Sequence, residues 1–133
     1  MKNDISAIGN ALVDTVFKVE HSLISELGLE IDQMTLSSAE EHAPIIDRLI
    51  SSGAETISDC GGSATNSLVA AASFGAKCFH TCKVSEDQDG LKYLKSLKDA
   101  GVGHKGNMAP ASNIPTGKCL ILVTPDAKRT MTT

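Results

Sequence analysis

Short apolar or β-branched runs alternate along the chain with amphipathic stretches, an order typical of strands followed by helices. Strands are predicted at residues 5–9, 15–19, 34–36, 56–60, 77–84, 118–124 and 129–132. Helices are predicted from a cap at Ser22 to Leu27, from about residue 43 to Gly53, over residues 63–74, and from a cap at Ser85 to Gly101. This alternation predicts an α/β domain with a mainly parallel sheet flanked by helices.

Two S-x-x-E/Q spacings predict helix starts. Ser38 and Glu41 have the spacing of a capping box, and so do Ser85 and Gln88. Pro44 conflicts with the first of these, because a proline inside a helix removes a backbone donor. We therefore expect that helix to begin near residue 43.

Several extended segments do not fit a parallel layer. The segments after Asn10 and Gln33, together with the hairpin formed by the last two predicted strands, are expected to form a small accessory β-sheet. Residues 106–115 contain turn-favouring residues, among them Gly106, Pro110 and Pro115, and predict a loop. The chain ends within a predicted strand, so we expect it to be part of a longer protein.

Length and composition narrow the functional classes. The chain has 133 residues, of which 41% are hydrophobic, enough for one domain or one incomplete domain. It has three Phe, one Tyr and no Trp, and its net charge is −4. Nucleic-acid binders use aromatic platforms and a concentrated basic face, so a nucleic-acid partner is not expected.

No targeting, membrane or metal signal is found in the sequence. No run approaches the roughly 18 apolar residues of a membrane helix, and the N-terminus lacks a signal-peptide pattern, so we expect a cytoplasmic protein with no membrane partner. The four cysteines form no C-x-x-C pair and are expected to be reduced. Cys78, His80 and Cys82 alternate on one strand, with poor spacing for a tetrahedral site, so a core role is expected and no metal site is predicted.

The segment Gly61-Gly62-Ser63-Ala64-Thr65-Asn66 lies between a predicted strand and a predicted helix. Paired glycines let the backbone approach a ligand, and the helix N-terminus behind them directs N–H groups toward it. Neither the phosphate-binding G-x-x-x-x-G-K-[ST] pattern nor G-x-G-x-x-G is present. The neutral hydroxyls of a sugar or nucleoside are therefore the better match. The alternative is a tight turn with Ser63 as N-cap.

Asn10 and Asp14 follow the first predicted strand, where ligands bind in open α/β sheets. A carboxylate such as Asp14 can accept hydrogen bonds from two vicinal hydroxyls. We therefore expect this loop and the paired-glycine loop to face one pocket. The alternative is that Asp14 is a turn residue that satisfies local backbone groups.

Four motifs, in order along the chain, resemble those of the PfkB carbohydrate kinases, the family of ribokinase and adenosine kinase. They are Ile8-Gly9-Asn10-Ala11-Leu12-Val13-Asp14, the run from Gly61 to Ser67 with its Ala-rich helix, Val84-Ser85-Glu86-Asp87-Gln88-Asp89-Gly90, and the tail from Thr116 to Met131. The tail resembles bacterial adenosine kinase-like members in particular. The motifs cover nearly the whole chain.

This resemblance implies a ribokinase-like fold and an ATP-dependent transfer of the γ-phosphoryl group, with Mg²⁺, to a primary hydroxyl of a sugar or nucleoside. The positions that match the family's substrate-binding residues are Asn10, Asp14, Gly61, Gly62 and Asn66, with Ser63 as a weaker match. The accessory strands, approximately residues 11–19, 33–37 and 106–133, would form the family's lid, which in ribokinase-like members also makes a homodimer contact.

One departure from the family matters for activity. The family's G-A-G-D motif, which carries the general base, lies in its C-terminal half with most of the ATP site, and this chain does not contain it. We therefore assign no catalytic residue and expect residues 1–133 to be the N-terminal, acceptor-binding portion, inactive alone. The alternative is a non-catalytic small-molecule binding module. The sequence leaves open the particular acceptor, the oligomeric state and any role of Arg129.

Overall fold

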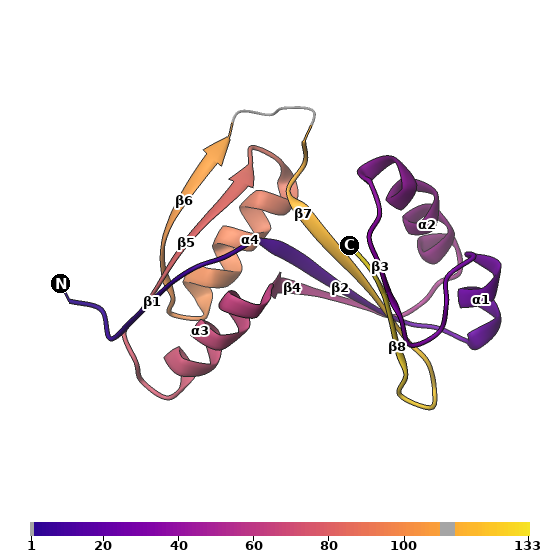
Figure 1. The fold of residues 1–133 in the computed structure, drawn as a ribbon, viewed down its shortest axis with the longest axis horizontal. Helices are drawn as coiled ribbons and strands as arrows, with labels where there is room; N and C mark the ends of the chain where they lie inside the picture. The colour runs from indigo at the N-terminus through magenta and orange to yellow at the C-terminus, as the bar shows by residue number, and fades with distance from the viewer. Residues whose placement is uncertain (1, 110–113) are drawn as a thin grey trace. The chain divides into compact units, whose positions relative to one another are not determined.

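The structure is a computed structural model that describes residues 2–109 and 114–133. Its elements in chain order are β1 (Ile5–Ile8), β2 (Leu12–Lys18), α1 (His21–Glu26), β3 (Met34–Thr35), α2 (Ala39–Ser51), β4 (Thr56–Gly61), α3 (Ser63–Ser73), β5 (Cys78–Ser85), α4 (Gln88–Asp99), β6 (Gly103–Ala109), β7 (Gly117–Val123) and β8 (Arg129–Thr132) (Figure 1). No helix in the described ranges is long and apolar enough to cross a bilayer.

The chain forms two compact units, which we describe separately. The first unit consists of Met1–Val13 and Asp59–Gly117, and the second of Asp14–Ser58 and Lys118–Thr133.

The first unit contains a three-stranded sheet in the order β1-β5-β6, and both strand pairs are parallel. This confirms the predicted parallel layer. The loop predicted from residue 106 was wrong for residues 106–109, which extend β6 along β5 as far as the pair Ser85 and Ala109. Pairing with a neighbouring strand outweighs the weak strand propensity of this glycine-containing segment. Residues 110–113 of the predicted loop lie outside the described residues.

One face of this sheet carries the core of the first unit. Cys78, Cys82 and Val84 alternate along β5 and are buried in one cluster with Leu68 of α3 and Leu97 of α4. Both helices therefore pack on the same face of the sheet. His80 lies on this face of β5 and is fully buried, so the core role expected for Cys78, His80 and Cys82 is confirmed.

The starts of the two helices in the first unit differ in how well they were predicted. The helix predicted from residue 63 is confirmed, because α3 begins at Ser63; its N-cap is Gly62, so the alternative with Ser63 as N-cap was wrong. The N-cap of α4 is Asp87, whose carboxylate accepts a hydrogen bond from Gly90 N at 2.7 Å, so the capping box predicted at Ser85 was wrong. Aspartate is among the strongest N-caps, and here it displaces the start of the helix by two residues.

The second sheet has the strand order β3-β8-β7-β2-β4, with β7 and β8 antiparallel and β3 and β8 parallel. It gathers the hairpin and the extended segments that were expected to form an accessory sheet. It also includes β4, which was not expected there. Because β2 begins at Leu12, the polar bend after β1 is shorter than predicted, and Asp14 lies within a strand.

The helices of the second unit cover a core formed by Leu23 and Ile24 of α1, Leu49 of α2, and Phe17 and Leu122 of the strands. The predicted cap of α1 at Ser22 was wrong, because its N-cap is Glu20.

The start of α2 also differs from the prediction. Both bonds of the Ser38–Glu41 capping box are present, at 3.2 Å and 2.7 Å, so the helix begins at Ala39 and Pro44 lies inside it. The later start that we favoured was wrong. The capping box satisfies two helix-terminal donors, which offsets the hydrogen bond that Pro44 cannot make.

Candidate functional site

The turn between β4 and α3 lies directly against the loop that follows β1. Gly62 has a φ of +100°, and a Cβ built on it would lie 2.7 Å from the carbonyl oxygen of Asn10. A Cβ on Gly9 would lie 2.7 Å from the Cβ of Ala64. Only glycine tolerates both the backbone angle and the close approach at position 62. The structure therefore brings Asn10 and Gly62 together.

The first turn of α3 has no side-chain cap. Its N-cap, Gly62, makes no side-chain hydrogen bond, and the helical bonding starts with Asn66 N donating to Gly62 O at 2.9 Å. The first backbone N–H groups of a helix have no partner within the helix and carry partial positive charge. Ser63 and Asn66 are exposed on the same turn, while Gly61 is buried at the end of β4. This end of α3 can donate hydrogen bonds to oxygen atoms of a ligand.

Asp14 is placed differently from the other predicted site residues. It lies on β2 in the second unit and is half-buried. Burial raises the pKa of the Cys119 thiol, and the negative charge of Asp14 raises it further. Asn10 and Gly62 belong to the first unit. The convergence of Asp14 with Asn10 and Asn66 therefore stays a prediction.

A cavity of about 650 Å³ opens at the carboxyl ends of β1 and β5 in the first unit, where ligands bind in open α/β sheets. Its walls are residues 8–12, 81–85 and 114–117. Asn10 is the one predicted site residue in this lining; Gly61, Gly62, Ser63 and Asn66 are not part of it among the described residues.

One wall of this cavity is fixed by a carboxylate that sequence reasoning missed. Asp87 accepts hydrogen bonds from Gly90 N, from the Thr116 hydroxyl at 2.7 Å and from Thr116 N at 2.8 Å. The Thr116 hydroxyl accepts from Ser85 N at 3.0 Å, and the Ser85 hydroxyl donates to Ile114 O at 2.6 Å. The signal that could have identified this cap is the aspartate itself, because Asp87 directly precedes the amphipathic helix and aspartate is a preferred N-cap residue.

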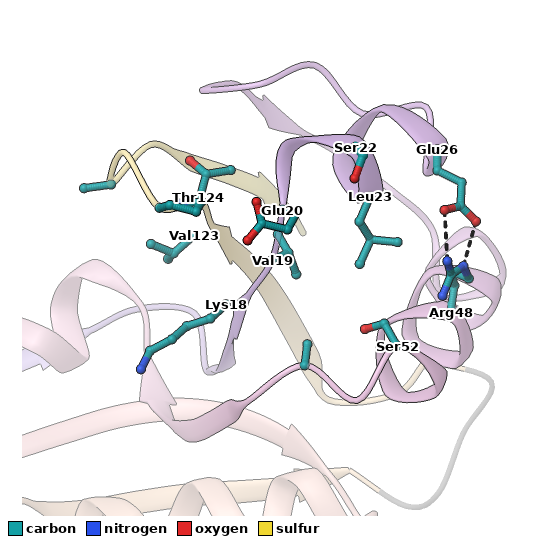
Figure 2. A pocket seen from close by; sticks show the side chains of 13 residues that line it. Lys18, Val19, Glu20, Ser22, Leu23, Glu26, Arg48, Ser52, Val123 and Thr124 are labelled. Atoms are coloured by element: carbon teal, nitrogen blue, oxygen red, sulfur yellow. Dashed lines mark hydrogen bonds and ion pairs between the residues drawn. The ribbon is translucent and has the colours of Figure 1, made fainter.

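A second cavity, of about 610 Å³, lies in the second unit (Figure 2). Its apolar lining includes Val19, Leu23 and Val123. Arg48 forms a bidentate pair with Glu26, with N–O distances of 2.7 Å and 2.9 Å, and both side chains line the cavity. The hydrogen bond from Arg48 holds the pKa of the Glu26 carboxyl below its usual range. These charges already neutralise each other.

The family resemblance implies Mg²⁺, but the described residues contain no group of side chains that would bind it. Within residues 2–109 and 114–133, no three His, Cys, Asp or Glu side chains lie close enough together to hold a metal ion. No step of the chemistry is therefore assigned to a metal bound by this chain.

Comparison with protein families gives one match. The model of the pfkB family carbohydrate kinases matches residues 30–133 of the chain. No match was found among curated proteins.

Solved structures of kinases share the fold. The chain is similar to an adenosine kinase from Sinorhizobium meliloti, with 29% identity and a TM-score of 0.86 over 99% of the chain and 39% of that protein. It is similar to a probable sugar kinase from Rhizobium etli, with 26% identity and a TM-score of 0.85 over 98% of the chain and 38% of that protein. An adenosine kinase from Anopheles gambiae, in complex with P1,P4-di(adenosine-5) tetraphosphate, has 27% identity and a TM-score of 0.78 over 96% of the chain and 37% of its own length.

These similarities confirm the predicted ribokinase-like α/β fold. The chain spans less than two-fifths of the length of each of these kinases.

Proposed function

Because the chain belongs to the pfkB family of carbohydrate kinases, we propose that it is the N-terminal, acceptor-binding part of an ATP-dependent kinase that phosphorylates a primary hydroxyl of a sugar or nucleoside. The observation that carries this proposal is the family match over residues 30–133. The similarity to an adenosine kinase over 99% of the chain supports it. The contact between the Asn10 loop and the paired-glycine turn supports the location of the acceptor site.

The proposed acceptor site uses neutral polar groups and one carboxylate. Asn10, Ser63 and Asn66 can donate to and accept from sugar hydroxyls, and Gly61 and Gly62 allow close backbone approach. Asp14 would accept hydrogen bonds from two adjacent hydroxyls. These residues bind and orient the acceptor, because phosphoryl transfer depends on holding the reacting groups in line. ATP, when bound, supplies the phosphoryl group.

We propose that the general base that deprotonates the acceptor hydroxyl lies outside residues 1–133. The sequence contains no G-A-G-D tetrapeptide, which carries the general base in the family that the chain resembles. We propose that most of the ATP site and the metal site also lie outside residues 1–133. The segments 11–19, 33–37 and 106–133, apart from residues 106–109 of β6, are proposed to form a lid, with a homodimer contact through it, in a cytoplasmic protein.

A phosphorylation screen tests the proposal. Adenosine, ribose, fructose and 2-keto-3-deoxygluconate are each incubated with ATP and Mg²⁺, with either the 133-residue chain or a protein extended downstream through any G-A-G-D motif. We expect phosphorylation of one acceptor by the extended protein and none by the chain alone. Turnover by the chain alone would show that residues 1–133 contain a complete active site.

A second candidate function is a non-catalytic module that binds a sugar or nucleoside. It would use the same contact between the Asn10 loop and the paired-glycine turn, which offers groups for binding an acceptor but no general base. A gene without a downstream G-A-G-D motif, encoding a protein that binds an acceptor without phosphorylating it, would support this alternative.

The role of Asp14 is tested by Asp14→Ala in the extended protein. We expect KM for the acceptor to rise and kcat/KM to fall by at least about tenfold, or roughly 1.4 kcal/mol, the loss expected for a charged hydrogen bond. Asp47→Ala, which removes an exposed carboxylate from α2, is the matched control and should leave kcat/KM unchanged. Unchanged kinetics for Asp14→Ala would remove this residue from the site.

A further inference from the structure

A buried polar network lies beneath the paired-glycine turn in the first unit. The Thr65 hydroxyl lies 2.6 Å from the Tyr93 hydroxyl and 3.4 Å from His80 Nε2. His80 Nδ1 lies 3.4 Å from the carbonyl oxygen of Ala7. Thr65, His80 and Tyr93 each have 0% of their surface exposed. Cys82 is also buried, and its thiol is hydrogen-bonded to Tyr93.

The chemistry of the partners fixes the direction of each hydrogen bond. The carbonyl of Ala7 can only accept, so His80 Nδ1 carries a proton and donates to it. In the neutral ring, Nε2 then has the lone pair and accepts from the Thr65 hydroxyl. Thr65 has then used its one proton, so the Tyr93 hydroxyl donates to Thr65.

This network joins the three segments that surround the proposed acceptor site. Ala7 lies on β1, two residues before Gly9, and Thr65 is the third residue of α3, directly before Asn66. Cys82 lies on β5 and lines the cavity at the strand ends, as does Gly9. The His80 ring also lies behind Gly9, because a Cβ there would be 3.6 Å from His80 Cε1.

We infer that Thr65 is a positioning residue, which fixes the paired-glycine turn and Asn66 against β1 and β5 through Tyr93 and His80. This inference rests on the proposed function, because it assigns the network to the acceptor site. The Thr65 side chain is fully buried and does not contact the acceptor. It acts through the orientation of the first turn of α3, on which Ser63 and Asn66 are exposed.

The network is sensitive to loss of one hydroxyl. A buried polar group that loses its hydrogen-bond partner destabilises the folded protein, because water cannot replace that partner. When one member of the network is removed, we therefore expect the remaining side chains to rearrange. Thr65→Val has nearly the same shape but removes the partner of His80 Nε2 and leaves the Tyr93 hydroxyl with Cys82 alone. Thr65→Ser retains the hydroxyl and should restore the network.

The test measures acceptor binding and the state of His80 in the same variants of the extended protein. For Thr65→Val we expect the dissociation constant of the acceptor found in the screen to rise about three- to tenfold, the range of one hydrogen bond. Thr65→Ser should bind within about twofold of the wild type. In the wild type at alkaline pH, the ¹⁵N shifts of His80 should show a protonated Nδ1 and an unprotonated Nε2, and Thr65→Val should move the Nε2 shift.

Val102→Ala separates positioning from general destabilisation. Val102 is buried in the same core cluster, but its side chain has no hydrogen-bonding group and so takes no part in the polar network. We expect this variant to be destabilised while its acceptor affinity stays that of the wild type. Equal weakening of binding by Thr65→Val and Val102→Ala would overturn the inference. So would wild-type affinity in a folded Thr65→Val protein, or a wild-type His80 protonated at Nε2.

The two proposals fail in different ways. A wild-type extended protein that binds none of the tested acceptors refutes the proposed function and with it this inference. A wild-type protein that binds an acceptor, with a Thr65→Val variant that binds it equally well, refutes only the role of Thr65.

Discussion

Two cavities among the described residues have nearly the same volume, about 650 Å³ in the first unit and about 610 Å³ in the second, but they differ in their polar groups. The first is formed by loop backbone at the ends of parallel strands, and buried directional hydrogen bonds fix its walls. The second is lined by charged side chains that are already paired, such as Arg48 and Glu26 (Figure 2).

This difference shows that cavity size alone does not identify a binding site. A ligand is held by polar groups whose partners are not yet satisfied and whose positions are fixed before binding. In the first unit these groups lie in the loop at Asn10, which lines the first cavity, and in the first turn of α3, which lies against that loop but does not line the cavity. Exposed ion pairs contribute little and exchange easily with water. Substitutions of polar residues should therefore lower the free energy of unfolding strongly in the first unit and weakly around the second cavity.

The largest effect is expected for Asp87→Ala. It removes three hydrogen bonds to a carboxylate, and leaves Thr116 N without its partner, so we expect the free energy of unfolding to fall by about 3 kcal/mol. Asp99→Ala is the control on the same helix. It removes an exposed ion pair with Lys95, and its effect should be much smaller. Urea denaturation of both variants measures the difference, and similar losses would contradict the comparison.

The next effect is expected for Gly62→Ala. Position 62 combines a φ of +100° with a contact of 2.7 Å to the Asn10 carbonyl, so alanine should cost about 2–3 kcal/mol of unfolding free energy. Gly75→Ala has a similar angle, +92°, but nothing within 4 Å, so it should cost about 1 kcal/mol. Chemical denaturation of the two variants separates the cost of the close contact with Asn10 from the cost of the positive φ angle. Equal costs would mean that the approach of the two loops is loose.

His42 tests a buried polar pair in the second unit. Its Nε2 lies 3.0 Å from the Thr132 hydroxyl, and burial lowers its pKa from the usual 6.5. As the pH falls through about 6.5, the unfolded chain binds this proton first, so stability should decrease until the pKa of the folded state is passed. His42→Gln should flatten this part of the pH dependence of unfolding. The same slope in both proteins would show that His42 does not cause it.

The smallest effect is expected for Glu26→Gln at the second cavity. Because the folded pKa of Glu26 is lowered mainly by the hydrogen bond from Arg48, its contribution is present at neutral pH and is lost as the pH falls through that pKa, below 4.5. The pair is exposed, so the contribution should be small and should decrease with salt. Denaturation midpoints of the wild type and Glu26→Gln are compared at low and high NaCl and at neutral and acidic pH. A large difference that does not depend on salt would contradict this expectation.

The parts of the fold that depend on local patterns could be predicted from the sequence. The alternation of strands and helices gave the parallel layer, and Ser38 with Glu41 marked the capping box of α2. Predictions failed where two local signals competed. Pro44 was weighted above the capping box of α2, and the spacing of Ser85 and Gln88 was taken as a capping box while Asp87 was overlooked.

The remaining features depend on contacts between distant segments. The extension of β6 and the place of β4 in the second sheet come from pairing with other strands, which leaves no local pattern. Thr65 was predicted within a site motif, but its side chain turns inward to Tyr93, 28 residues away. Asn10 and Gly62 could be paired in advance because both follow strands, and the structure places them in contact.

The most direct test of the acceptor site is a titration of the ¹⁵N-labelled chain with adenosine and with the sugars of the screen, followed through its amide resonances. We predict shifts at Asn10, Gly62, Ser63 and Asn66, with little change at residues that line the second cavity, such as Ser22 and Thr124. Shifts confined to the second cavity, or none at the turn before α3, would contradict the account.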